Sequence, residues 1–177
     1  MRKLVAVITL ILVLGVVNWS IYKKEQLLEN GQIVYLKLVP VDPRSLMQGD
    51  YMALRFAVSR DIGKALSFPK SNTFKTIIDV NTFDGFALLS LDENNVGSFI
   101  NISKTVNIKN TKAIGNMVAI KFRQRGEQIK IGTNAFFFEE GKGDELEMAK
   151  YGKFRVNASG DLLLVSLADE TFNLLAQ

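Results

Sequence analysis

The sequence predicts a mainly β protein: a single N-terminal transmembrane helix followed by a small β-barrel or β-sandwich domain that contains one short helix. Two observations carry this prediction. The chain of 177 residues has a long apolar run without charge near its start. Beyond that run, apolar and polar residues alternate in short segments separated by turn residues. We therefore expect an anchor over residues 1–22, a helical stalk over 23–31 and a β domain over 32–177.

The anchor is predicted from the run that begins at Leu4 and ends at Tyr22, because none of its 19 residues is charged. As a helix this run would be about 28 Å long, which matches the ~30 Å hydrocarbon core of a bilayer. Trp19 and Tyr22 stand at its far end, where amphipathic rings favour the headgroup layer. A cleaved signal peptide is the main alternative, but small residues at the spacing of a cleavage site do not follow the run.

The cations at the two ends of the run bear on its orientation. Arg2, Lys3 and the terminal amine precede it, whereas Lys23 and Lys24 follow it. Because cationic flanks tend to stay inside, we expect a cytoplasmic N-terminus and an extracytoplasmic domain. The lack of cysteine is compatible with that location.

The stalk and the domain are predicted from the residues that follow the anchor. Residues 23–30 are a polar continuation of the helix, and Gly31 follows them as a helix stop. Val34, Leu36 and Leu38 then alternate with polar residues, which places them on one face of a strand. An acidic first turn predicts the one short helix over 144–150. The expected strands cover residues 32–39, 51–58, 74–80, 86–91, 96–102, 117–123, 129–138, 154–156 and 161–167.

Composition excludes several classes of site. The chain has no histidine and no cysteine, which excludes a Ser-His-Asp triad, a cysteine nucleophile, a zinc site of histidines or thiolates, and a disulfide. It also has no glycine-rich phosphate loop. The net charge is +4, but two of the 22 basic residues precede the anchor, so the domain lacks the clustered basic excess of a nucleic-acid-binding protein. We expect no cofactor, no metal and no nucleic acid partner.

Residues 39–56 form the most distinctive segment. Pro40 and Pro43 restrict the backbone, and Gly49 with Asp50 predicts a turn into the next strand. Turn chemistry alone accounts for these residues, which is the first interpretation. The alternative is a binding loop held by rigid strands, and its lining would be Asp42, Arg44, Asp50 and Tyr51.

The same segment resembles the signature of the bacterial GDYXXLXY family. Gly49, Asp50, Tyr51 and Leu54 match that motif, and Phe56 stands where the motif has tyrosine. The preceding Asp-Pro-Arg is similar to the family's usual lead-in, and the layout of a hydrophobic segment before one domain is similar along the whole chain. The resemblance implies a bacterial envelope protein without an assigned activity, often encoded near multi-pass membrane proteins. The candidate motif residues are Asp42, Arg44, Gly49, Asp50, Tyr51, Leu54 and Phe56.

A second resemblance concerns the nucleophile box of membrane-anchored signal peptidases, which use a Ser/Lys pair and need no histidine. Leu46, Gly49 and Asp50 are similar to the end of that box. Aligning them places Val41 where the nucleophilic serine belongs, and a valine side chain cannot attack a carbonyl. Ser45 lies nearby in the sequence, but it would need a lysine within hydrogen-bond reach. The resemblance therefore implies a shared strand entry without the protease chemistry.

A basic face is predicted along two neighbouring strands and their turn. Lys121, Arg123, Arg125 and Lys130 have spacings that expose them on one side. The simpler interpretation is a solvated face that discourages edge-to-edge pairing of the sheet. The alternative is a contact with anionic lipid headgroups near the anchor or with an acidic partner.

Taken together, these features predict a non-catalytic, membrane-anchored accessory or partner-binding protein of the bacterial envelope. We expect it in the inner membrane, with a periplasmic domain that binds a multi-pass membrane protein of the same system. One alternative is a degenerate hydrolase of the signal-peptidase type that uses the loop over residues 42–51. Another is a small-ligand sensor that uses the barrel interior, against which the 12 phenylalanines argue because they would fill the core.

Overall fold

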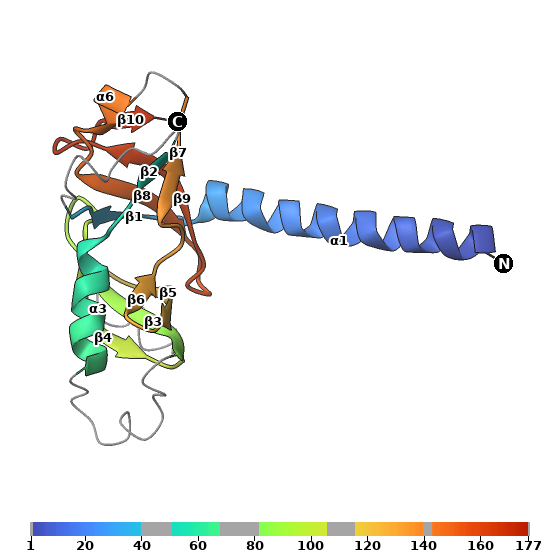
Figure 1. Ribbon diagram of the computed structural model, residues 1–177, viewed down its shortest axis with the longest axis horizontal. Helices are drawn as coiled ribbons and strands as arrows, with labels where there is room; N and C mark the ends of the chain where they lie inside the picture. The colour runs from blue at the N-terminus through green and yellow to red at the C-terminus, as the bar shows by residue number, and fades with distance from the viewer. Residues whose placement is uncertain (1, 40–50, 68–81, 106–115, 140–142, 177) are drawn as a thin grey trace.

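The computed structural model describes residues 2–39, 51–67, 82–105, 116–139 and 143–176. One long helix, α1 (Arg2–Asn30), projects from the long side of a domain built mainly of strands (Figure 1). The described strands form two four-stranded sheets and one two-stranded sheet. The predicted fold class is confirmed, since an apolar N-terminal helix precedes a small, mainly β domain.

The predicted anchor and stalk are one continuous helix. α1 has 29 residues and is therefore about 44 Å long. Its stretch from Lys3 to Asn30 is long and apolar enough to cross a membrane, although a signal sequence would meet the same criterion. Outside the domain its apolar side chains are exposed, whereas Leu27 is buried against the domain. The helix ends where the sequence predicts, because the Gly31 N–H donates to the Leu27 carbonyl oxygen at 3.0 Å and β1 begins at the next residue.

The first sheet continues directly from α1. Its order is β1 (Gln32–Lys37), β8 (Tyr151–Val156), β9 (Leu162–Ala168) and β10 (Leu174–Ala176), and all neighbours are antiparallel. The predicted faces of β1 are confirmed: Val34 and Leu36 are fully buried, and Lys37 is exposed. The joint with α1 therefore lies at the edge strand and at its neighbour.

The second sheet has the order β4 (Gly97–Ser103), β3 (Thr82–Leu91), β5 (Met117–Arg125) and β6 (Gln128–Lys130), again antiparallel. Val118, Ile120 and Phe122 of β5 are buried, as their alternation predicts, and Lys121 and Arg123 on the other face are exposed. The helix α3 (Ala57–Ser67) packs on the buried side of this sheet through β4 and β6. The outer side of the sheet therefore faces away from α3.

Smaller elements complete the domain. β2 (Tyr51–Ala53) pairs with β7 (Ala135–Phe137), and α6 (Gly143–Leu146) forms one turn. The core between these layers contains two aromatic pairs. Phe56 packs edge-on against Phe154 at 5.3 Å between ring centroids, and Phe83 lies 5.8 Å from Phe122. Large apolar side chains from both sheets and α3 thus fill one shared interior.

The strand expected over residues 51–58 is wrong after Ala53, because the chain enters α3 at Ala57. The buried side chains Val58, Ile62 and Leu66 are four residues apart, which is a helical spacing. The period-two alternation from Met52 onward ends on the same Val58, so the strand pattern obscured the start of the helix. The main helix of the described domain is therefore α3, and not the segment over 144–150 that the sequence predicts.

Other boundaries also differ. The expected strand over 129–138 divides into β6 and β7 around Gly132, whose φ of +60° favours glycine. β8 begins at Tyr151, and the helix expected over 144–150 shrinks to α6. The three-residue β10 was not expected, because it is too short to show alternation. The strand expected over 74–80 lies outside the described residues.

Candidate functional site

Two of the motif residues are part of the core. Leu54 and Phe56 are 3% and 2% exposed, and the Leu54 N–H donates to the Asn134 carbonyl oxygen at 2.7 Å. The Phe56 ring lies so close to Gly152 that a Cβ there would stand 3.0 Å from it. Their apolar side chains therefore hold the short segment between β2 and α3 against the first sheet.

The remaining motif residues divide into two groups. The Tyr51 backbone begins β2 opposite Phe137. Asp42, Arg44, Gly49 and Asp50 lie outside the described residues, so the expected binding loop stays a prediction.

The predicted basic face does form one surface, on the outer side of β3, β5 and β6. In the strand register Asp84 lies opposite Arg123, which lies opposite Lys130, so the three form a row across the sheet. Arg125 binds Asp84 with two hydrogen bonds, of 2.6 and 3.0 Å. Lys121 binds Asp161 at 2.6 Å. The structure thus brings all four predicted cations together and pairs two of them with carboxylates.

Both carboxylates are held in their charged form. The hydrogen bond from Arg125 holds the pKa of Asp84 below its ordinary value, and the charge of Arg123 acts in the same direction. Burial acts to raise the pKa of Asp161, but hydrogen bonds from Lys121 and Asn157 outweigh it, so that pKa is also lowered. Lys24 of α1 contributes to the lowering at Asp161. The charge of Lys24 on α1 therefore acts on the β8–β9 turn.

A surface hollow of about 400 Å³ lies on this face, between the sheet and the base of α1. Four cations and two carboxylates line it: Lys24, Lys121, Arg123, Lys130, Asp84 and Asp161. Sequence reasoning did not include Lys24 or either carboxylate in this face, because about 40 positions separate each carboxylate from its cation. Of these three residues, only Asp84 could have been assigned to this face from the sequence, because it takes an outward position in an alternating strand.

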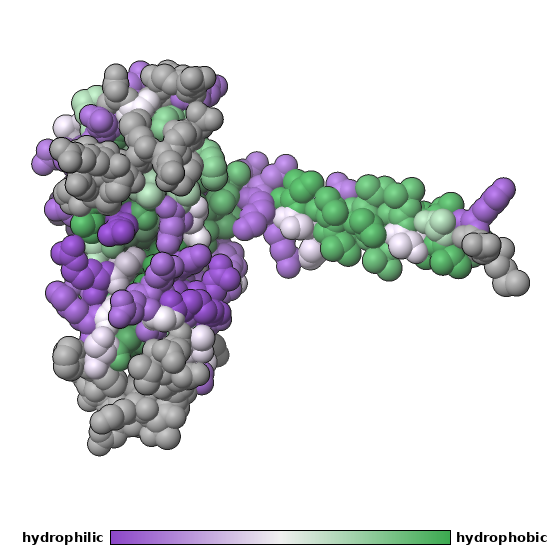
Figure 2. All heavy atoms as spheres, in the orientation of Figure 1, coloured by the Kyte–Doolittle hydropathy of each residue, from purple (hydrophilic) through white to green (hydrophobic). Residues whose placement is uncertain are grey.

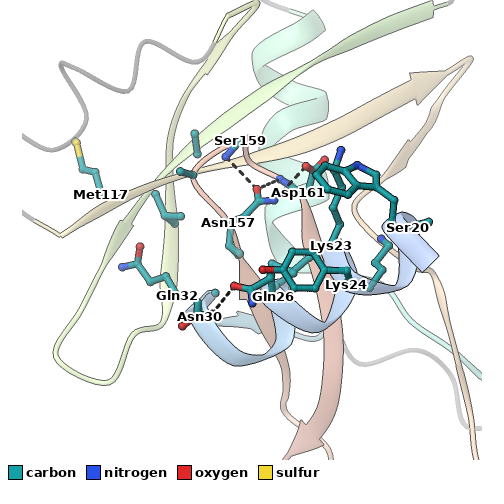
Figure 3. Close-up of a pocket in the computed structure, with 18 residues that line it drawn as sticks. Ser20, Lys23, Lys24, Gln26, Asn30, Gln32, Met117, Asn157, Ser159 and Asp161 are labelled. Atoms are coloured by element: carbon teal, nitrogen blue, oxygen red, sulfur yellow. Dashed lines mark hydrogen bonds between the residues drawn. The ribbon is translucent and has the colours of Figure 1, made fainter. Parts of the chain in front are cut away.

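A second hollow, of about 740 Å³, lies directly between α1 and the domain (Figure 3). Its α1 wall carries the interfacial rings Trp19 and Tyr22, and the Lys23 ammonium lies 5.5 Å from the Trp19 ring centroid. Its opposite wall is the turn between β8 and β9, where the Asn157 side-chain oxygen accepts N–H groups of Ser159 and Asp161. The turn therefore faces the aromatic end of the predicted span across this hollow.

Residues 13–167 match the family described as GDYXXLXY protein. This chain belongs to the GDYXXLXY family. The match begins within the predicted membrane span and ends in β9, so it includes the second half of the span and most of the domain. No curated protein and no solved structure matches the chain.

Among the GDYXXLXY motif positions, Phe56 departs from the pattern by lacking the tyrosine hydroxyl. Its ring is buried against Phe154 and Gly152, which are apolar neighbours. A hydroxyl at this depth would need a hydrogen-bond partner, so phenylalanine suits the site as it stands here.

Proposed function

We propose that this GDYXXLXY protein is a non-catalytic accessory protein that α1 anchors in the bacterial inner membrane. Its N-terminus would lie in the cytoplasm and its domain in the periplasm, where the domain binds a multi-pass membrane protein of the same system. The family membership and the long apolar helix support an envelope location without naming an activity.

The linker-free joint between α1 and the domain is the observation that carries this proposal. The helix runs from the predicted span into the domain without a linker, and Leu27 is only 4% exposed. The Arg155 guanidinium donates to the Gly31 carbonyl oxygen at 2.8 Å and ties β8 to the end of the helix. A flexible tether would let the domain search solution for a soluble partner. A rigid joint instead holds the domain at the bilayer, where a membrane protein is the natural partner.

The hydrolase alternative depends on residues 42–51, of which only Tyr51 lies in the described part of the chain. No contact among the described residues favours it over the accessory role. The sensor alternative needs an internal cavity, whereas the described interior is occupied by large side chains such as Phe122, Phe154 and Ile131, all at most 2% exposed.

Affinity purification from detergent-solubilised membranes tests the proposal. The full chain should retain a multi-pass membrane protein in stoichiometric amount. A variant with about ten Gly/Ser residues inserted between Asn30 and Gly31 should stay in the membrane and fold but lose that partner. The same Gly/Ser segment appended to the C-terminus is the control and should retain it. Absence of a stoichiometric partner, or equal retention by the insertion variant, would contradict the proposal.

A further inference from the structure

We propose that the outer face of β3, β5 and β6, together with Lys24, binds the phosphate groups of anionic phospholipids in the membrane that α1 crosses. We name Lys24, Lys121, Arg123 and Lys130 the headgroup surface. The inference rests on one element of the proposed function, namely that α1 spans a bilayer, and it does not depend on the protein partner or on the orientation of the span.

The first support is the height of this surface above the bilayer. Trp19 and Tyr22 mark the level of the headgroup layer, because amphipathic rings concentrate there. Lys24 follows Tyr22 by two residues, a rise of about 3 Å, and each headgroup layer is roughly 5–8 Å thick. The domain lies next to this part of α1, since Met117 and the turn at Asn157 line the hollow that also contains Trp19. The headgroup surface therefore stands beside the layer that would contain the phosphates.

The second support is the direction in which the headgroup surface faces. α3 packs on the inner side of the second sheet, so the headgroup surface lies on the side opposite to α3. Figure 1 shows α3 on the far side of the domain from α1. Figure 2 shows hydrophilic side chains gathered over the domain beside and below the base of α1. A bilayer crossed by α1 would lie along this side, so the cations would face its surface.

The third support is the excess of positive charge on the headgroup surface. Arg125 already occupies both oxygens of Asp84, and Lys121 occupies Asp161. Arg123 and Lys130 lie directly opposite each other in the β5–β6 register, and neither forms an ion pair with any described residue. Like charges directly opposite on adjacent strands destabilise a sheet. The carboxylate in their row, Asp84, lies opposite Arg123 but is already bound by Arg125 through both oxygens, so positive charge remains in excess on this face. A lipid phosphate would balance that excess, and Lys24 reaches the same hollow from the anchor.

The test uses the full chain in lipid nanodiscs, and the absence of cysteine allows a single fluorescent label on Gln128→Cys. Gln128 is exposed and two residues before Lys130 on β6, so the label shares the face of the headgroup surface. Because the joint is rigid, this face approaches the bilayer when the whole molecule tilts on its anchor. Lipids with a spin label on the headgroup quench the dye in that tilted, bound position. We expect stronger quenching with about 30% phosphatidylglycerol than with phosphatidylcholine alone, and weaker quenching at high salt.

The decisive variant is Arg123→Gln/Lys130→Gln, and Arg60→Gln/Lys64→Gln on the exposed side of α3 is its matched control. Each positive charge near an anionic bilayer should raise the ratio of lipid-bound to unbound headgroup surface roughly fivefold. Removing two charges with the first pair should therefore lower this ratio by about 25-fold. The control pair should leave it unchanged. Equal quenching in neutral and anionic discs would overturn the proposal and favour an acidic protein as the ligand. Equal loss in the control pair would also overturn it.

Alkaline extraction separates this failure from that of the proposed function. A chain that leaves the discs at alkaline pH is not anchored, and the envelope-accessory proposal then fails as well. A chain that stays in the discs without any dependence on anionic lipid contradicts the headgroup surface alone.

Discussion

At the scale of single residues, Gly31 decides how the anchor meets the domain. A Cβ at this position would collide with the Leu27 carbonyl oxygen and stand 3.0 Å from the Arg155 Cβ. Both neighbours are fixed, one by the helix and the other by β8. The joint therefore requires glycine because of close approach.

Gly31→Ala should accordingly lower the free energy of unfolding of the domain by about 1–3 kcal/mol, as overpacking does. Denaturant titration of the full chain in detergent, followed by the circular dichroism of the strands, measures this. Gly15→Ala is the control, because the same added methyl meets nothing within 4 Å. Equal stability of the two variants would contradict the tight joint.

The motif residue Leu54 gives a second prediction at this scale. If the motif is structural, Leu54→Ala should cost about 2–5 kcal/mol of unfolding free energy, because the side chain is only 3% exposed. Arg55→Ala changes the exposed neighbour and should stay within about 0.5 kcal/mol of the parent. The same denaturant titration tests both variants. A Leu54→Ala protein of parental stability would favour a binding role for the motif.

Asp161 predicts how stability depends on pH. Its pKa is lowered in the folded state, so its contribution is complete above the ordinary carboxyl pKa of about 4 and is lost as pH falls through that range. Because both partners of the Lys121 pair are about half exposed, the contribution is small. Asp161→Asn should make the decline of unfolding free energy below pH 4 shallower, and Glu93→Gln in the exposed β3–β4 turn should not. A parallel decline in parent and Asp161→Asn would refute this assignment.

At the scale of elements, alternation predicted most strands of the described chain because one side of each sheet is buried. β1 and β5 show this directly, since Val34, Leu36, Val118 and Ile120 lie in the core as expected. The same rule failed at α3, because Val58 belongs both to the alternation that begins at Met52 and to the helical spacing of the buried residues of α3. It also failed at β10, which has only three residues. The basic face was predictable along β5 and β6, but its carboxylates and Lys24 come together only through tertiary packing.

The helical assignment of residues 57–67 is testable by proline. Lys64 is exposed at the start of the last turn of α3, so Lys64→Pro should cost about 3 kcal/mol by removing a helical hydrogen bond and by the clash of the ring with the preceding turn. Lys64→Ala keeps the backbone donor and should be nearly neutral. Denaturant titration compares the two. Tolerance of proline would mean that this segment is not helical, in agreement with the strand that the sequence predicts over residues 51–58.

At the scale of the whole molecule, we expect the anchor and the domain to move as one rigid body. α1 enters the domain without a linker, contacts β8 and β9, and shares two surface hollows with the second sheet and the β8–β9 turn. This arrangement would keep the domain beside the bilayer that we propose α1 crosses. The accessory role and the headgroup surface both depend on it.

The most direct test of that central claim is a distance distribution between spin labels on Gly15→Cys and Glu127→Cys, measured by double electron–electron resonance in nanodiscs. Gly15 lies within the predicted span, and Glu127 lies in the exposed β5–β6 turn. We predict one narrow distribution, because a rigid joint fixes both labels. A broad distribution would show a flexible tether. The absence of any distance between the two labels, because the segment with Gly15→Cys has been removed, would show that the anchor is cleaved. Either result would contradict the account.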